Sequence, residues 1–328
     1  MKAYERYQVR HKPAEEDEST TTIVLAMAAN IVVAVGKTIA SVVTGSASML
    51  AEAVHSWVDV GNEFFIVRAF KTANRKPDLL HPMGYGRESY VWSLFAALGL
   101  LMLGSVATVW HGVTELRDDT EGTANYLVGY LVLGASFIVE GVSFVQTYRQ
   151  MSAGGEALGR STFEHAARTS NSPLRAVFTE DFLALISLVI AAVAMVLHQL
   201  TNRAVFDATG SIVIGVLMGL AALMLINNNR EYLSGKSPAP EFRRRVIEAL
   251  QKQEDVARVT FVYAEFIGPD RLLVIAGVAL KNERTQAELA YALRKIESNL
   301  KEHKFIGMAF LSLATPDEDD VKLDLLAP

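Results

Sequence analysis

The stretch ASMLAEAVHSWVDVGNEFFIVRAF, residues 47–70, decides the fold class. It exceeds the roughly 20 residues that a helix needs to cross a bilayer, yet it carries polar side chains at regular intervals. Spacings of three, four and three residues place four of them on one face of a helix: Glu52, His55, Asp59 and Asn62. An ionisable group inside a membrane span is costly and usually faces a cavity, so this face predicts a functional site in a membrane protein.

Five further apolar stretches of similar length accompany it in the first 226 residues. The whole chain of 328 residues is 51% hydrophobic and only 20% charged, with a mean hydropathy of +0.23, which is typical of a polytopic membrane protein. The six predicted transmembrane helices cover residues 22–44, 47–70, 89–116, 124–146, 174–198 and 204–226.

The distribution of Lys and Arg predicts the orientation of these spans. Six spans place both chain ends on one side, and that side receives the Lys and Arg residues of the tail and of most connections. The other side receives only Arg117 and Arg203. Positive residues favour the cytoplasm, so both termini are expected there. A bacterial inner membrane is the default expectation, and an organelle membrane is the alternative.

The composition changes after the sixth span. A polar run from Asn227 ends at Pro238 and Pro240, residues that stop helices, and beyond it the pattern is that of a small α+β domain. Its expected order is helix, strand, strand, helix, strand, over residues 241–253, 258–266, 271–280, 285–302 and 305–313. The predicted division is a tail at 1–21, a transmembrane domain at 22–226, a linker at 227–240 and a cytoplasmic domain at 241–328.

His55 and Asp59 are the strongest candidate ligands in the second span, because two such residues four apart on a helix can bind one cation. The alternative is a polar stripe that hydrogen-bonds to neighbouring helices. The chain has no cysteine, so a metal site must use histidine and carboxylates. A dehydrated cation also needs negative charge from a second helix, and Glu180 and Asp181 of the fifth span supply it.

The depths of the two acidic segments support a shared site. At about 1.5 Å per residue, Asp59 lies roughly 18 Å below the outer end of its span, and Asp181 roughly 12 Å above the inner end of its own. These depths coincide in a hydrocarbon core of about 30 Å. His55, Asp59 and Asp181 are therefore expected to meet.

The same arithmetic places the remaining polar groups of the spans. Asn30 and Glu140 fall near the inner third, close to the level of Glu180, where they are expected to line a cytoplasmic access route. Lys37 falls near the outer third at a depth similar to that of Glu52, and a pair between them would neutralise both charges. The alternative for Lys37 is extension of its side chain to the membrane surface.

Other classes of function find little support in the sequence. The net charge of −5 argues against nucleic acid as a partner, and no nucleophile, phosphate loop or hydrolase motif indicates an enzyme. Between the second and third spans, Asp78 and His81 could bind a metal at the cytoplasmic surface, or they could simply be solvated.

The run HPMGYGRE, residues 81–88, together with His55 and Asp59, resembles the cation diffusion facilitator family, in particular its zinc transporter 9 type. The resemblance implies six spans with cytoplasmic termini and a cytoplasmic metallochaperone-like, or ferredoxin-like, domain. It also implies a homodimer that exports divalent cations, chiefly Zn²⁺, with protons as the counter-ion.

The family's transport site maps onto His55, Asp59 and Asp181. Val177 stands where members usually carry a His or Asp, so Glu180 or water is the candidate for the fourth ligand. The family's loop site maps onto Asp78 and His81, with Tyr85 in place of its second histidine. The His and Asp ligands that some members carry in the last strand have no match in residues 310–316.

The hypothesis favoured by these observations is a proton-coupled exporter of Zn²⁺, because metal and protons compete for the lone pairs of the same His and carboxylate ligands. One histidine and several carboxylates also suit Mn²⁺, Fe²⁺ or Co²⁺. A second hypothesis is a membrane-anchored metal sensor or scaffold without transport, which has no need for His55, Asp59 and Asp181.

Overall fold

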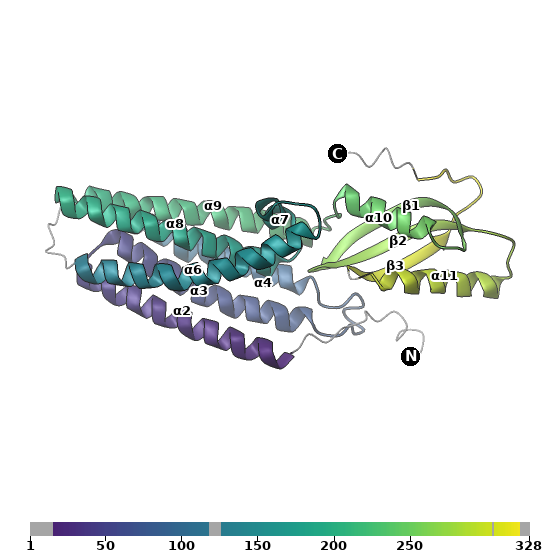
Figure 1. Ribbon diagram of the computed structural model, residues 1–328, viewed down its shortest axis with the longest axis horizontal. Helices are drawn as coiled ribbons and strands as arrows, with labels where there is room; N and C mark the ends of the chain where they lie inside the picture. Colours follow the sequence, from purple (N-terminus) through teal and green to yellow (C-terminus); the bar gives the residue numbers. More distant parts are fainter. Residues whose placement is uncertain (1–15, 118–125, 304, 322–328) are drawn as a thin grey trace. The chain divides into compact units, whose positions relative to one another are not determined.

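The computed structural model describes residues 16–117, 126–303 and 305–321 (Figure 1). The chain divides into two compact units. The described parts of residues 13–71 and 89–230 form a unit of long helices, and those of residues 72–88 and 231–328 form a unit with a small sheet. This confirms the predicted fold class, a helical membrane domain joined to an α+β domain.

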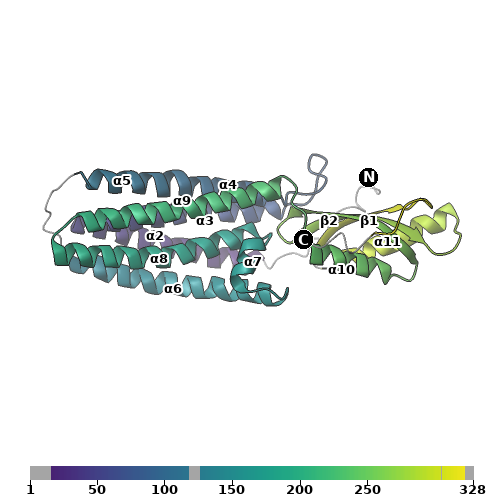
Figure 2. The ribbon, with the colours of Figure 1, turned by 90° about the horizontal axis from the view of Figure 1, so that it is seen from above.

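The helical unit contains long helices that lie side by side along their length (Figure 2). Its elements are α2 (Glu16–Thr44), α3 (Ala47–Ala73), α4 (Glu88–Gly99), η1 (Leu100–Val106), α5 (Ala107–Glu115), α6 (Tyr126–Glu156), α7 (Thr162–Arg168), α8 (Ser172–Thr201) and α9 (Val205–Leu233). The segment η1 is a π-helical stretch between α4 and α5.

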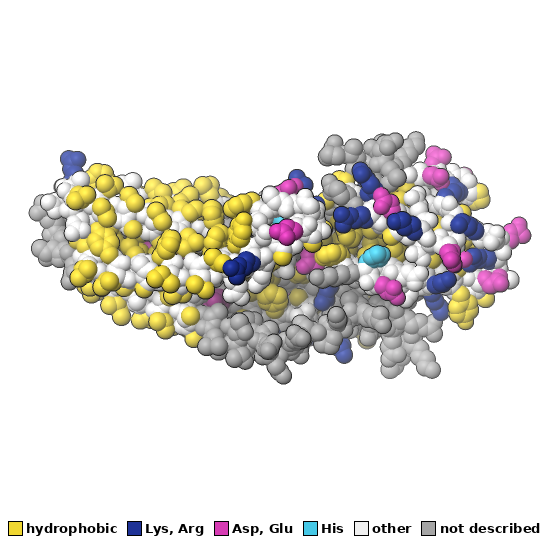
Figure 3. Space-filling view, viewed as in Figure 1, with side chains coloured by type: hydrophobic (Ala, Val, Ile, Leu, Met, Phe, Trp, Pro, Cys, Tyr) yellow, Lys and Arg dark blue, Asp and Glu magenta, His cyan; other side chains and the backbone are white. Residues whose placement is uncertain are grey.

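Five helices in the described part of the chain are long and apolar enough to cross a membrane: residues 27–44, 88–115, 126–156, 172–201 and 205–233. The remaining predicted span, the second along the chain, corresponds to α3, whose 27 residues suffice in length and whose polar stripe lowers its hydropathy. Hydrophobic side chains cover the visible face of the helical unit (Figure 3). Val42 and Trp110 are 79% and 73% exposed, as lipid-facing residues would be.

The first turn of α3 is capped by a carboxylate from another helix. Asp207 of α9 is buried and accepts hydrogen bonds from the backbone amides of Ala47, at 2.6 Å, and Ser48, at 3.4 Å. The hydroxyls of Ser46 and Ser48 donate to the same carboxylate. A negative group at a helix N-terminus satisfies unpaired amides and complements the helix dipole. Asp207 therefore fixes the start of α3 to the start of α9.

Small residues let α9 pack closely against the interrupted helix. A Cβ atom added at Gly215 would lie 2.7 Å from the side chain of Val109, so only glycine fits this contact. The hydroxyl of Ser211, one turn away, donates to the backbone carbonyl of Thr108 at 3.3 Å. This contact is structural and holds α9 against η1 and α5.

The second unit contains α10 (Pro240–Gln251), β1 (Val256–Gly268), β2 (Arg271–Leu280), α11 (Gln286–Lys301) and β3 (Ile306–Leu313). The predicted order of elements is confirmed. The sheet has the order β1-β2-β3, with β1 antiparallel and β3 parallel to β2. Both helices pack on one face, where Leu250 of α10 and Ile296 of α11 share a core with Val274 of β2.

The loop at residues 72–88 belongs to this second unit. Arg87 forms an ion pair with Glu265 of β1, and Arg271 of β2 donates to Asn74 at 3.4 Å. The backbone of Gly86 lies against the turn that joins β1 to β2, where a side chain would collide with Gly268. The connection between α3 and α4 is thus held to the sheet.

Candidate metal site

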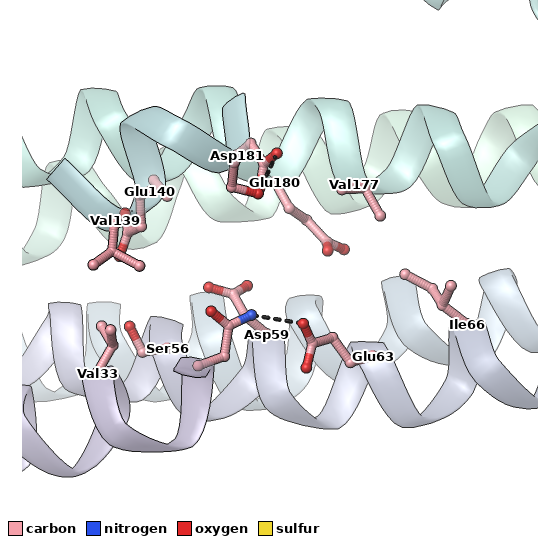
Figure 4. Close-up of a pocket in the computed structure, with 13 residues that line it drawn as sticks. Val33, Ser56, Asp59, Glu63, Ile66, Val139, Glu140, Val177, Glu180 and Asp181 are labelled. Carbon is pink, nitrogen blue, oxygen red and sulfur yellow. Dashed lines mark hydrogen bonds between the residues drawn. The ribbon is translucent and has the colours of Figure 1, made fainter. Parts of the chain in front are cut away.

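A cavity of about 90 Å³ lies within the helical unit, among α2, α3, α6 and α8 (Figure 4). Its described lining contains five carboxylates: Asp59, Glu63, Glu140, Glu180 and Asp181. An amide and two hydroxyls join them, from Asn30, Ser56 and Ser143, and the other lining residues are apolar. A concentration of acidic groups in a small space inside a membrane domain suits a cationic substrate.

His55 and Asp59 face each other on α3, as their spacing predicted. Nε2 of His55 lies 3.6 Å from Oδ1 of Asp59. Both atoms are buried, and neither has a hydrogen-bond partner among the described residues. Asp59 lines the cavity, whereas His55 is 1% exposed and packs behind it with Nδ1 3.4 Å from the hydroxyl of Ser187. A nitrogen and an oxygen that could both bind a metal ion are thus directed at each other.

Glu180 and Asp181 approach the same cavity from α8. Figure 4 shows the carboxylate of Asp59 directed from α3 toward α8, and that of Glu180 directed back toward α3. Asp181 accepts hydrogen bonds from Thr147, at 2.8 Å, and Ser143, at 3.1 Å. The structure therefore places Asp59 and Asp181 at one cavity, as the depth argument predicted, and Glu180 and Val177 line the same cavity.

Two asparagines noted in the sequence donate hydrogen bonds to acids of this cavity. Asn62 of α3 donates to Glu180 at 2.8 Å, and Asn30 of α2 lines the cavity and donates to Glu63 at 2.7 Å. The sequence argument missed Glu63, although it follows Asp59 by four residues and continues the spacing of His55 and Asp59.

Lys37 forms the predicted pair with Glu52, with 2.8 Å between Nζ and Oε2. Its side chain is 1% exposed, so the alternative of extension to the surface is wrong. Lys37 also contacts Glu140 at 2.7 Å. The separate depths predicted for Lys37 and Glu140 are therefore wrong. Lysine and glutamate have long side chains that together bridge several residues of helix rise, so depths counted from residue numbers do not decide whether the two groups meet.

The loop residues Asp78, His81 and Tyr85 form a cluster in the other unit. The hydroxyl of Tyr85 donates to Asp78 at 2.6 Å, and Nδ1 of His81 lies 3.5 Å from the same carboxylate. The hydrogen bond from Tyr85 holds the pKa of Asp78 below its ordinary value. The guanidinium of Arg75 stacks on Tyr85 at 4.3 Å. The hydroxyl of Tyr85 thus occupies one oxygen of the Asp78 carboxylate, which a metal ion at this loop would need as a ligand.

In the part of the chain that the structure describes, no three His, Asp or Glu side chains converge closely enough to hold a metal ion between them. The cavity nevertheless gathers carboxylates from facing helices, with Asp59 on α3 and Glu180 and Asp181 on α8. The structure thus places the candidate carboxylates around a common cavity, with His55 behind Asp59 and outside the lining.

The chain is similar in sequence to known proteins. The family model described as the cation efflux transmembrane domain matches residues 23–234. Metal tolerance protein C4 of Arabidopsis thaliana is 34% identical over 67% of this chain and 48% of its own length. The human protein named proton-coupled zinc antiporter SLC30A9, mitochondrial, is 30% identical over 71% of this chain and 41% of its own.

A third relative, the manganese efflux system protein MneP of Bacillus subtilis, is 21% identical over 91% of this chain and 93% of its own length. The alignments to the plant and human relatives span less than half of those proteins. The family match extends from α2 to the end of α9 and includes all the cavity residues. The chain therefore belongs to the cation diffusion facilitator family, whose members are integral membrane transporters of divalent metal cations.

Proposed function

We propose that this protein exports Zn²⁺ from the cytoplasm in exchange for protons. The observation that carries the proposal is the placement of Asp59, Glu180 and Asp181 around one cavity within the helices, with His55 directed at Asp59. The proposed ligands are His55, Asp59 and Asp181, with Glu180 as the fourth. One nitrogen and three oxygens suit the tetrahedral shell of zinc. The name of the human relative agrees with this choice of metal.

Mn²⁺ is the alternative substrate, and Fe²⁺ and Co²⁺ are also compatible with histidine and carboxylate ligands. The name of the Bacillus subtilis relative supports manganese in this family. Val177 removes one possible nitrogen ligand from α8, which favours harder cations than a site with two histidines would. A competition series that measures uptake of each cation separates these substrates.

Proton exchange follows from the chemistry of the ligands. Metal ions bind the deprotonated carboxylates and the neutral imidazole, so the ion leaves as these groups take up protons. Alternating access requires that the cavity open to one side at a time, through movement of the helices around a site near the middle of the membrane. The cavity is lined by residues of four helices, α2, α3, α6 and α8, whose relative movement would change access to it.

The proposed assembly is a homodimer with both termini in the cytoplasm, in a bacterial inner membrane or an organelle membrane. The proposed transport domain is residues 22–226, joined by a linker at 227–240 to the dimerising domain at 241–328. The sheet face opposite α10 and α11 exposes Phe261 and Tyr263, which are 42% and 45% exposed. Apolar side chains on an open sheet face favour contact with a second copy.

Flux measurements in proteoliposomes test the proposal. The wild-type protein is expected to move Zn²⁺ at a rate that follows an imposed pH gradient, and Asp59→Ala and Asp181→Ala are expected to reduce that flux to background. Glu164→Ala is the control, because Glu164 is an exposed acid of α7 outside the cavity. Zinc flux that ignores both the pH gradient and the loss of Asp59 contradicts the proposal.

A further inference from the structure

Lys37 joins three helices of the transport domain through a buried ion-pair network. Its ammonium lies 2.8 Å from Oε2 of Glu52 on α3 and 2.7 Å from Oε1 of Glu140 on α6. Lys37 and Glu52 are 1% and 0% exposed, and Glu140 is 13% exposed. Each carboxylate uses one oxygen for Lys37. The other oxygen of each is buried without a hydrogen-bond partner among the described residues.

The two carboxylates differ in what else they face. Glu140 lines the cavity together with Asp59 and Asp181, whereas Glu52 does not line it. Glu140 is therefore within reach of a cation in the cavity while it is also paired with the resident ammonium of Lys37. A free carboxylate in that place would add a full negative charge to the site, and a paired one adds much less.

We propose that the ammonium of Lys37 competes with the transported cation for Glu140 and so limits how tightly the cavity retains its ion. The inference rests on the proposed function, in which the cavity holds a divalent cation during transport. A pathway must bind its ion well enough to load it and weakly enough to release it. Lys37 is in this sense a positioning residue that acts through Glu140.

Two double variants separate this role from a purely structural one. Lys37→Met with Glu52→Gln leaves Glu140 as a free carboxylate at the cavity. Lys37→Met with Glu140→Gln leaves Glu52, which does not line it. Each variant removes both ion pairs and keeps one carboxylate, so both retain the net charge of −1 that one Lys and two Glu carry in the wild type. A structural role predicts the same behaviour for the two.

Titration of the purified full-length protein with Zn²⁺, together with flux in proteoliposomes, gives the readout. Lys37→Met/Glu52→Gln is expected to bind Zn²⁺ about tenfold more tightly than the wild type and to release it more slowly, which lowers the maximal flux. Lys37→Met/Glu140→Gln is expected to show no tightening. Equal affinities in the two double variants overturn the inference.

A single substitution keeps the inference testable if a double variant does not fold. Glu140→Gln leaves the pair between Lys37 and Glu52 intact and removes a carboxylate whose charge Lys37 already offsets in part. Its expected loss of Zn²⁺ affinity is therefore much smaller than that of Asp59→Asn, and a loss of equal size overturns the inference. A wild-type protein that neither binds nor moves divalent cations contradicts the proposed function itself. If the wild type transports Zn²⁺ and the two double variants bind it with equal affinity, only the role proposed for Lys37 is contradicted.

Discussion

The hydroxyl of Ser187 on α8 lies 3.4 Å from Nδ1 of His55 on α3. The same hydroxyl donates its single proton to the backbone carbonyl of Ala184 at 3.0 Å. Its oxygen is therefore left to accept a proton from Nδ1, which places the free lone pair of the imidazole on Nε2, the atom directed at Asp59. Ser187 thus leaves Nε2 of His55 able to act as the proposed ligand atom.

Ser187→Ala is expected to weaken cation binding by about tenfold, the lower end of what loss of a partner that orients a metal-binding histidine costs. The substitution leaves the ligands in place and removes the group that fixes the ring. Ser187→Thr retains a hydroxyl and is the matched control, with affinity expected closer to that of the wild type. Titration of both variants with Zn²⁺ provides the measurement. Wild-type affinity in Ser187→Ala would show that the ring needs no such support.

Glu63→Gln is expected to raise the cation concentration needed for half-maximal uptake by up to about tenfold at low ionic strength, because an acidic group at a cavity concentrates cations locally. Glutamine still accepts the hydrogen bond from Asn30, so only the charge changes. The difference should shrink at high salt. Initial uptake rates at two salt concentrations measure it, with Glu164→Gln as the control. A change in maximal rate alone would contradict this role for Glu63.

Asp207→Ala is expected to lower the free energy of unfolding by about 2 kcal/mol, because the amides of Ala47 and Ser48 lose a buried acceptor. Unfolding titrations of the protein in detergent micelles measure the change. Asp319→Ala, at an exposed acid of the other unit, is the control and should leave the midpoint unchanged. An unchanged midpoint for Asp207→Ala would mean that water replaces the carboxylate at no cost.

Tyr85→Phe is expected to raise the pKa of Asp78 toward its ordinary value of about 3.9, because the hydrogen bond from the tyrosine hydroxyl favours the charged carboxylate. A carboxyl group whose pKa is depressed on folding stabilises the folded loop above its unfolded pKa. That contribution is lost as pH falls through the folded pKa. In Tyr85→Phe, the stability of the folded loop should therefore fall less as the pH is lowered through this range. Carboxyl-carbon NMR titration reports the pKa, and an unaltered value would contradict the contact.

Much of the fold could be predicted from hydrophobic length and helix spacing alone. The apolar stretch that begins near residue 124 predicted a span, but its end at residue 146 did not predict the end of α6 at Glu156. A helix can continue into water after its apolar stretch ends, because backbone hydrogen bonds and not composition keep it helical. The strands of the sheet were predicted within a few residues because alternation is a strong signal over short segments.

The candidate site was predicted where a general electrostatic requirement applied. A dehydrated dication needs acids from two helices, which led from Asp59 to Asp181. Contacts that depend on three-dimensional placement were not predicted. The bond between Lys37 and Glu140 depends on where α6 sits beside α2. The cap from Asp207 to Ala47 joins residues 160 positions apart, for which the sequence carries no local signal.

The hydrogen bonds from the first turn of α3 to Asp207 hold that end of the helix in place, so α3 can pivot about it. With 27 residues, α3 is about 40 Å long, so a tilt of about 10° about its first turn displaces its last turn by about 7 Å. Asp59 lies near the midpoint of α3 and Glu63 slightly beyond it, so the same tilt displaces both residues less than it displaces the last turn. A small displacement of Asp59 at the cavity therefore corresponds to a larger displacement of the end of α3, where the loop at residues 72–88 begins.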